Sequence, residues 1–417
     1  MPSARPARLP VSLLTGLAVD AKARTARAAR RRVPGLAVVE VAFGPADGAA
    51  PGACGLVRWS VTHPDGRTDD GGVELEHLCV SCAVGEAVLP RLLDLAGDGG
   101  VRQVLLVLPP QMEADAFLHA FFASDVDGVP IARSVAIDTV ACVVDLARVV
   151  DDLAGGERLA DRGMALAPED HRAVAVLAAD HVEAADVLVC ADTEPDVIDS
   201  ARAQALLHHV NPRARHLRMV PDPVHGLQPP SVDAFLGAWS FDIELLGLRD
   251  EAVGVPHPVP GEEDGVVTTL WRARRPFHPR RLYDALEEVM AGVLRGRGHL
   301  WLAGRPDEVL VWESAGEHLA IVPGGPWLPE ADTGPDAEAW QEVSPERRTL
   351  ASFHWDPYYG ERRSELRFTG IGLDVPSLHR VLDAALVTDE ELADGERIRR
   401  AAAEDPFAVL GGGEERG

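Results

Sequence analysis

Lysine is almost absent from this 417-residue sequence: of its 40 basic residues, only Lys22 is a lysine and the others are arginines. A sequence that uses arginine wherever a positive charge suffices draws attention to the one position that keeps lysine. Cysteine is also scarce, because five cysteines in a chain of this length do not make a disulfide framework. Long apolar runs are missing as well, and none approaches the roughly 18 residues that a membrane-spanning helix needs.

The apolar stretch near the N-terminus, Val11–Leu14, is too short for the core of a signal peptide, so we expect a cytoplasmic protein. Basic charge is in deficit: 66 acidic residues face 40 basic ones, and the formal net charge is −26. A field of that sign repels phosphate backbones at long range, which disfavours broad binding to nucleic acids and excludes DNA as an expected partner. A local basic patch remains compatible with docking on RNA or on a protein.

Apolar runs of strand length alternate with helical patterns in the first half of the chain, which predicts an α/β domain with a parallel sheet. The runs are rich in Val and Leu, as buried parallel strands tend to be. The predicted strands are Val11–Leu14, Leu36–Val41, Val101–Leu108, Ser134–Val144 and Ala185–Cys190. We expect the helix after the first of them to span Ala21–Arg32.

Proline and glycine accumulate over residues 221–265, where we place the boundary between two domains. The prediction is a first domain over 1–225, a linker over 226–265, a second domain over 266–390 and a partly disordered tail over 391–417. Strand and helix patterns in the second domain, among them strands at Val266–Ala273 and Thr349–Trp355, indicate an antiparallel sheet with helices packed on it. The second domain is therefore expected to be α+β and smaller than the first.

Several phrases in the second domain are specific. Arg275-Pro276-Phe277-His278-Pro279 opens a helix, Leu300 to Asp307 spells LWLAGRPD, Trp355 to Leu366 spells WDPYYGERRSEL, and Asp405-Pro406-Phe407 stands near the end. In this order they resemble the C-terminal domain of the CobW class of P-loop GTPases. The resemblance implies a P-loop NTPase-like first domain with a degenerate loop, followed by a CobW C-terminal α+β domain. Trp301, Trp312 and Trp355 are most simply core aromatics of that domain.

Arginines gather around the RPFHP phrase, at positions 272, 274, 275, 280 and 281. Together with Trp271 they suggest a docking face for RNA or for an acidic partner. The alternative is a solvated edge of a strand.

The P-loop segment of this chain keeps the spacing of the motif but has lost residues that bind the phosphates and Mg²⁺. A working loop has the pattern G-x-x-x-x-G-K-[ST], in which glycine backbone amides wrap the phosphates, lysine neutralises them and the hydroxyl binds Mg²⁺. Here Gly16 takes the first glycine position and Lys22 that of the lysine, but Ala21 replaces the second glycine and Ala23 replaces the hydroxyl. Asp20 adds negative charge where phosphates would lie, so GTP and Mg²⁺ binding are doubtful.

Guanine recognition needs an Asp in an N-K-x-D-like motif, and the matching position is Asp192, although the Asn-Lys pair is missing. Three roles remain open for Lys22: ordinary GTP hydrolysis, weak binding of a nucleotide or anion, or a solvated place in the first turn of a helix.

Cys79 and Cys82 form a C-x-x-C pair, which is a suitable spacing for chelating a metal. CobW proteins carry G-C-x-C-C at the corresponding place, and this chain has Ser81 in place of the middle cysteine. Glu76 and His77 lie close enough in sequence to complete a tetrahedral Zn²⁺ site with the two thiolates. Structural thiols and a redox pair are the alternatives. The other cysteines, Cys54, Cys142 and Cys190, lie in or beside apolar segments and are expected to be buried.

The degenerate loop, the segment E-x-x-H-x-C-V-S-C and the second domain together resemble an actinobacterial subgroup of ribosome-hibernation-factor-recruiting GTPases. That resemblance implies a recruitment factor acting under zinc limitation, with a hibernation-promoting factor and the ribosome as partners and no membrane. A metallochaperone that hydrolyses GTP to deliver zinc is the alternative function. An oxidoreductase using Cys79 and Cys82 is a third hypothesis.

Overall fold

The computed structural model describes residues 8–44, 55–76, 79–126, 128–167, 170–193, 197–222, 226–228, 234–250, 253, 261–329, 337–394 and 405–407. The chain divides into two compact units, Met1–Phe241 and Asp242–Gly417, and each is described by itself. None of the helices within the described ranges is long and apolar enough to cross a membrane.

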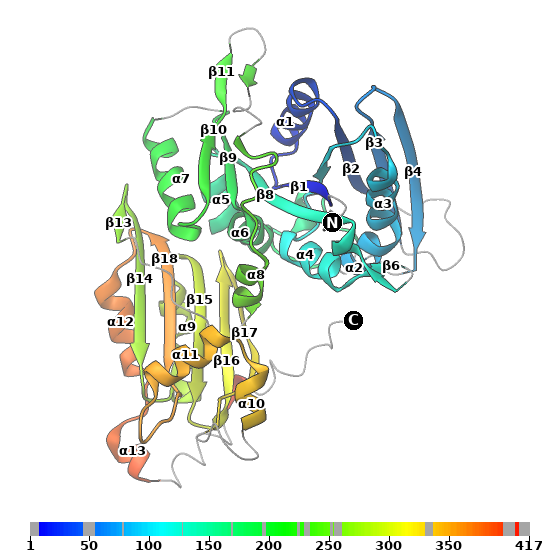
Figure 1. Ribbon diagram of the computed structural model, residues 1–417. Helices are drawn as coiled ribbons and strands as arrows, with labels where there is room; N and C mark the ends of the chain where they lie inside the picture. Colours follow the sequence, from blue (N-terminus) through cyan, green and yellow to red (C-terminus); the bar gives the residue numbers. More distant parts are fainter. Residues whose placement is uncertain are drawn as a thin grey trace. The chain divides into compact units, whose positions relative to one another are not determined.

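The described part of the first unit contains an eight-stranded sheet with the order β10-β9-β8-β1-β5-β2-β3-β4 (Figure 1). All neighbours from β10 to β2 are parallel, and β3 and β4 continue the sheet as antiparallel strands. The strands are β1 (Leu9–Thr15), β2 (Leu36–Gly44), β3 (Gly55–Thr62), β4 (Thr68–Leu75), β5 (Gln103–Val107), β8 (Val135–Asp145), β9 (Val187–Ala191) and β10 (Arg215–Arg218).

Helices connect these strands and cover the sheet. Helix α1 packs against a core formed by Leu14, Val38, Leu105 and Val143, while α4 packs against α6, which in turn contacts β8. The helices are α1 (Val19–Arg32), α2 (Val80–Cys82), the π-helix η1 (Ala83–Val88), α3 (Leu89–Gly97), α4 (Ala114–Ala123), α5 (Val149–Ala154), α6 (Val174–Ala184) and α7 (Val197–Val210).

Short elements complete this unit: β6 (Asp125–Val126), β7 (Val129–Pro130), η2 (Ile131–Arg133), η3 (Leu159–Arg162), β11 (Val220–Asp222) and β12 (Gly226–Gln228). The predicted parallel α/β sheet is confirmed. The predicted order of elements lacked β3 and β4, because their glycines and aspartates hide the alternation of a half-buried pair.

The second unit has a six-stranded antiparallel sheet, with the order β13-β14-β18-β15-β16-β17. Its strands are β13 (Glu262–Glu263), β14 (Val266–Ala273), β15 (Val293–Leu302), β16 (Arg305–Ala315), β17 (His318–Pro326) and β18 (Ser364–Ile371), and its helices are α8 (Ile243–Asp250), α9 (Pro279–Met290), α10 (Ala337–Glu342), α11 (Pro345–His354), α12 (Val375–Ala384) and α13 (Asp389–Ala393). The α+β prediction is therefore confirmed.

The largest hydrophobic cluster of this unit joins strand residues such as Phe368 to Leu282 of α9 and Leu382 of α12. Trp301 and Trp312 are buried, as predicted for core aromatics, whereas Trp355 is only half-buried. At Gly298, which has φ +152°, a Cβ atom would lie 2.0 Å from the carbonyl oxygen of Glu365, so the close approach of β15 to β18 requires glycine.

The strand predicted at Thr349–Trp355 is wrong, because this segment belongs to α11. The Ser344 side chain caps that helix by accepting a hydrogen bond from the amide of Arg347, and Pro345 occupies the first turn. Serine followed by proline is a signal for a helix start, and it outweighs the β propensity of the residues that follow.

Candidate functional site

The carboxyl ends of the parallel strands bring the predicted site residues to one edge of the first sheet. Gly16 follows β1 and Asp192 follows β9, and only β8 lies between these two strands. Strand β4 runs in the same direction as β2, because two antiparallel pairings separate them. The Cys79–Cys82 segment, which comes after β4, therefore lies beyond the same edge of the sheet.

The segment that would hold phosphates is folded as a helix start. Helix α1 begins at Val19, three residues before Lys22, with Ala18 as its N-cap. The amide of Lys22 donates to the carbonyl of Ala18 at 2.9 Å, and the amide of Val19 donates to that of Leu17 at 2.9 Å. Two of the backbone amides that a P-loop directs at phosphate are thus used inside the protein.

Gly16 is the one glycine that remains in this loop, and the backbone there requires it. Its φ is +107°, and a Cβ atom would lie 2.3 Å from the carbonyl oxygen of Val143 on the neighbouring strand. The turn out of β1 therefore keeps its glycine for steric reasons, whether or not a ligand binds.

Lys22 is buried, with 3% of its surface exposed, so the predicted alternative of a solvated lysine is wrong. Its Nζ donates a hydrogen bond of 2.7 Å to the carbonyl oxygen of Leu108. Burial lowers the pKa of Lys22 to about 8, because the charged form loses its hydration. The side chain thus points into the protein and fixes the segment after β5.

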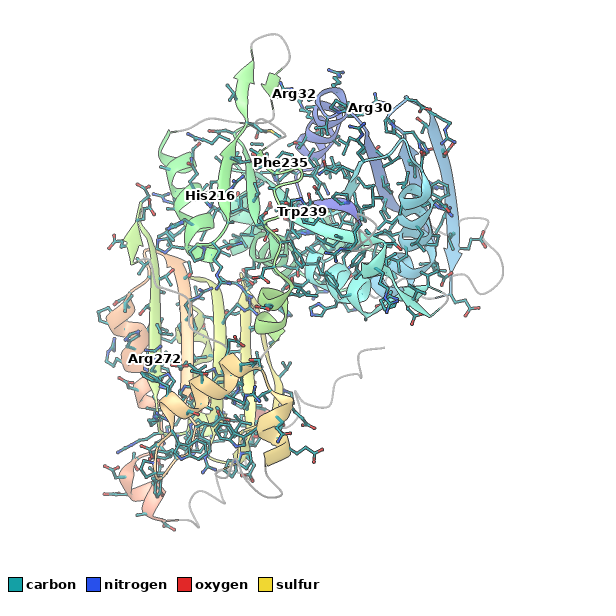
Figure 2. All side chains as sticks on the ribbon, in the orientation of Figure 1. Arg30, Arg32, His216, Phe235, Trp239 and Arg272 are labelled. Atoms are coloured by element: carbon teal, nitrogen blue, oxygen red, sulfur yellow. The ribbon has the colours of Figure 1, made fainter. Side chains whose placement is uncertain are left out.

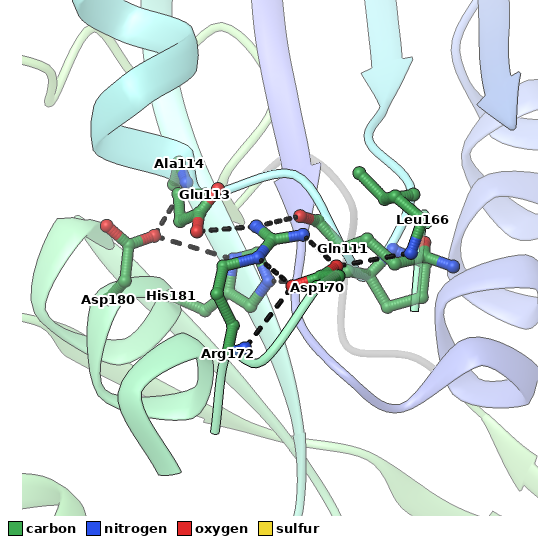
Figure 3. Close-up of polar contacts among 9 residues, drawn as sticks. Gln111, Glu113, Ala114, Leu166, Asp170, Arg172, Asp180 and His181 are labelled. Carbon is green, nitrogen blue, oxygen red and sulfur yellow. Dashed lines mark hydrogen bonds and ion pairs between the residues drawn. The ribbon is translucent and has the colours of Figure 1, made fainter. Parts of the chain in front are cut away.

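The segment 108–113 is held by side chains from α1, from α6 and from the loop before α6. Figure 3 shows the contacts of Arg172 in that loop. His181 of α6 contacts the Pro110 carbonyl oxygen through Nε2 at 3.0 Å. Arg172 donates to the Gln111 carbonyl oxygen at 2.9 Å and to the Glu113 carboxylate at 2.6 Å. With Lys22, these contacts occupy the carbonyls of Leu108, Pro110 and Gln111.

Charged groups of the same region complete the framework. Arg172 also pairs with Asp170 at 2.9 Å, and Asp180 accepts a hydrogen bond of 2.6 Å from the Ala114 amide at the start of α4. Burial, followed by the negative charge of Asp115, raises the pKa of Asp180 well above its usual range. Burial also lowers the pKa of His181 to about 4, with a smaller contribution from Lys22, so the imidazole is neutral at pH 7.

Arg172, Asp180 and His181 were not predicted from the sequence. The local signal is an acidic residue beside a histidine in the mostly apolar helix α6. Buried polar residues of this kind need partners, but the partners lie about 60 to 70 positions away in the sequence.

Asp192, the predicted base-recognition residue, is engaged in contacts of its own. Its Oδ2 accepts a hydrogen bond of 3.0 Å from the Ser200 hydroxyl and lies 3.7 Å from the Arg218 guanidinium. The second oxygen, Oδ1, is buried and has no hydrogen-bond partner within the described part of the chain. Asp192 therefore lies at the predicted edge as a partly buried, internally bonded carboxylate.

Cys79 and Cys82 lie at the start of a helix, and both are free thiols of intermediate exposure. The Cys79 sulfur accepts a hydrogen bond of 3.3 Å from the Cys82 amide, as a helix N-cap does. A hydrogen bond to Cys79, partial burial and the charges of Cys79 and Glu86 raise the pKa of Cys82 to about 11. The Cys79 and Cys82 side chains thus lie side by side, and the Cys82 thiol is protonated at neutral pH.

The remaining predicted zinc ligands are less well placed. Glu76 is exposed directly after β4, and His77 lies outside the described residues, so the complete set of four ligands is untested. Across the ranges that the structure describes, no three Cys, His, Asp or Glu side chains gather as metal ligands. Cys142 and Cys190 are buried as predicted, whereas Cys54 lies outside the described ranges.

Residues 266–386 match the family model of the cobalamin synthesis protein cobW C-terminal domain. The chain is 30% identical over 358 residues to the zinc chaperone Rv0106 of Mycobacterium tuberculosis, and the match covers 82% of this chain and 80% of that protein. The chain belongs to the CobW family of P-loop GTPases. In its first unit, residues 16–22 lead from β1 into α1, where the sequence predicts the phosphate-binding loop.

Other CobW-related proteins extend the comparison. The zinc-regulated GTPase metalloprotein activator 1 of Dictyostelium discoideum is 29% identical over 343 residues, covering 79% of this chain and 68% of that protein. The Zn(II)-bound YjiA GTPase of E. coli shares 16% sequence identity at a TM-score of 0.37, covering 91% of this chain and all of YjiA.

Proposed function

We propose that this CobW-family protein is a zinc metallochaperone, which binds Zn²⁺ through Cys79 and Cys82 and passes the ion to a partner protein. The observation that supports this most is the pair of neighbouring thiols at the start of a helix on the carboxyl edge of the sheet. Thiolates are preferred zinc ligands, and C-x-x-C spacing lets both bind one ion. The relatives named as a zinc chaperone and a zinc-regulated metalloprotein activator support the same function.

An incomplete ligand set fits transfer better than permanent storage. Structural zinc sites are usually closed by four protein ligands, whereas Cys79 and Cys82 supply two. A tetrahedral ion held by two thiolates keeps positions for His77, for Glu76 or for ligands of the protein that receives it. Exchange can then proceed by replacing one ligand at a time.

Removing both thiols should abolish high-affinity zinc binding. We expect Cys79→Ser combined with Cys82→Ser to weaken Zn²⁺ binding on the order of 100-fold or more, measured by competition with a chromophoric chelator. The parent affinity should also rise about tenfold per pH unit between pH 6 and 8, because binding displaces the Cys82 proton. This direction follows from the pKa of Cys82, which is raised to about 11 and leaves the metal-free thiol protonated.

The control is Cys142→Ala, which removes a buried thiol outside the pair and should leave zinc affinity unchanged. Glu76→Gln and His77→Gln, made separately, identify any further ligand. Zinc affinity that is unaffected by the loss of both cysteines would reject the proposal.

The residues of this loop give little support for the binding and hydrolysis of GTP. Val19 and Lys22 use their amides within the chain, Lys22 bonds to Leu108, and Ala23 has no hydroxyl for Mg²⁺. We infer that zinc transfer by this protein does not depend on an ordinary GTP hydrolysis cycle. Recruitment of a ribosome-hibernation factor stays a second candidate function. Side chains of the protein fix segment 108–113 without a nucleotide, which suits a binding protein that does not pass through a GTP cycle.

Lys22→Met tests whether zinc transfer depends on GTP. We expect no saturable binding of a fluorescent GTP analogue with Mg²⁺ to the parent or to the variant. The free energy of unfolding should change by less than about 1 kcal/mol, because loss of the bond to Leu108 is offset by removal of a buried cation.

Arg24→Met, a substitution on the exposed side of the same helix, is the matched control. Saturable GTP binding by the parent that Lys22→Met weakens at least tenfold would restore the hydrolysis-coupled metallochaperone.

A further inference from the structure

Helix α1 presents five arginines to solvent: Arg24, Arg27, Arg30, Arg31 and Arg32 are all exposed. Its opposite side packs on the sheet through Ala21, Lys22, Thr25, Ala26 and Ala29. Figure 2 labels Arg30 and Arg32 on this helix.

The arginines have a regular arrangement. Arg24, Arg27 and Arg31 follow the three- and four-residue spacing of one helical face, and at about 1.5 Å of rise per residue they span about 10 Å. Arg30 and Arg32 widen the row on its two sides near the C-terminus of the helix. We call these five residues the α1 arginine face.

None of the five guanidinium groups forms an ion pair or hydrogen bond with any residue that the structure describes. Asp20 in the first turn is the only acidic residue of the helix. The net charge of the chain is −26, so acidic partners are abundant elsewhere. Five adjacent cations that have no counterion among the described residues are unusual in a chain of this composition.

The other arginine cluster, predicted as a docking face, behaves differently. Arg272 pairs with Glu365 at 2.6 Å, Arg280 with Asp284 at 2.9 Å and Arg281 with Glu391 at 2.7 Å. Those three charges are neutralised within the second unit, and Arg275 pairs there with Asp389, so the cluster offers fewer free cations than α1. The comparison points to α1 as the stronger anion-binding surface.

Helix electrostatics explain only part of the α1 arginine face. Cations in the last turn are stabilised by the helix macrodipole by roughly 0.3–1 kcal/mol each, which favours Arg30, Arg31 and Arg32. Arg24 and Arg27 lie in the second and third turns, where the dipole does not stabilise cations. Their retention needs another reason, and an external anion supplies one.

We propose that the α1 arginine face docks on the phosphate backbone of double-helical RNA. Guanidinium groups bind phosphate oxygens bidentately, and contacts to phosphates need cations but no apolar anchors. On the rest of the helix surface, Val19 and Asp20 are exposed in the first turn, Ala23 and Ala28 are half-buried, and no side chain is aromatic. A protein partner would instead be expected to need more apolar anchors beside the arginines than the single Val19.

The shape of the RNA helix determines how it is recognised. Side chains cannot read base edges in the deep, narrow major groove of A-form RNA, so binding through phosphates is independent of sequence. The phosphates that flank the narrow major groove of A-form RNA form two rows that stand close together. An arginine face about 10 Å long and wider than one row can contact both rows, which the wider B-form major groove does not allow.

The test measures binding of a labelled RNA duplex of about 20 base pairs by fluorescence anisotropy. We expect a dissociation constant near the micromolar range at about 50 mM salt. The logarithm of the association constant should fall with the logarithm of the salt concentration with a slope of about −3 to −4, as expected for four neutralised phosphates. The triple variant Arg24→Gln, Arg27→Gln and Arg31→Gln should weaken binding at least tenfold and reduce the slope by about 3. Its thermal unfolding should match that of the parent, because these side chains are exposed.

The matched control replaces three arginines of the second unit with glutamine, the partly exposed Arg275 and the exposed Arg280 and Arg380, and should bind RNA as the parent does. The same DNA duplex should bind several-fold more weakly than RNA. Absence of RNA binding, equal loss in the control, equal affinity for DNA or preferential binding of a polyglutamate peptide would each overturn the proposal. The zinc assay is separate, and the arginine variant should keep its zinc affinity.

Discussion

Replacing Arg347 by alanine is expected to lower the free energy of unfolding of the second unit by about 3–5 kcal/mol. The Arg347 side chain is 6% exposed and that of Glu361 is fully buried. Arg347 holds Glu361 through both terminal nitrogens, one of them at 2.6 Å, and Glu361 also accepts a hydrogen bond from the Leu328 amide. Loss of the guanidinium leaves a buried carboxylate without its counterion.

Equilibrium unfolding in urea, followed by tryptophan fluorescence, checks this prediction. The fluorescence reports mainly on the second unit, which contains Trp271, Trp301, Trp312, Trp327, Trp340 and Trp355. Arg380→Ala, at an exposed site, should cost less than about 0.5 kcal/mol.

A second comparison shows whether the destabilisation comes from the unpaired charge of Glu361 or from lost packing of the Arg347 side chain. Arg347→Met combined with Glu361→Leu removes both charges and should recover at least about 1 kcal/mol relative to Arg347→Ala. If the double variant is no more stable than the single one, the ion pair is not the source of the effect.

The same region shows what the sequence could predict. The phrase that contains Glu361 marks the CobW C-terminal domain, and its tryptophans were expected in the core, as Trp301 and Trp312 are. Strand β14 was also predicted with the observed bounds, Val266–Ala273, since its β-branched run stands between clear turn residues. The partner of Glu361 could not be predicted, because Arg347 lies just before the strand that was predicted at Thr349–Trp355. The structure has both in helix α11 instead.

The site in the first unit divides in the same way. Gly16 and Lys22 could be found because their distances in sequence from β1 match those of the P-loop motif. The C-x-x-C spacing alone marks Cys79 and Cys82. The direction of the Lys22 side chain could not be predicted, since it depends on the Leu108 carbonyl, 86 residues away. Local spacing identifies which residues reach an edge of the sheet, but long-range packing decides which ligands they can still bind.

Acidification should release segment 108–113 through His181. Burial lowers the pKa of His181 in the folded protein to about 4, from a usual value of 6.5. Between these values the unfolded chain binds more protons than the folded one, so stability rises with pH across this window. The contribution is complete above pH 6.5 and is lost as the pH falls toward 4, by about 3 kcal/mol in total.

Asp180 acts in the opposite direction, because its raised pKa makes the folded state bind more protons above pH 3.8. The measurement must therefore be a difference: urea unfolding of the parent and of His181→Gln, from pH 4 to pH 7. Glutamine can still donate to the Pro110 carbonyl oxygen but does not titrate. We expect the parent to lose about 3 kcal/mol more than the variant on acidification, whereas parallel profiles would show that His181 does not fix this segment in its neutral form.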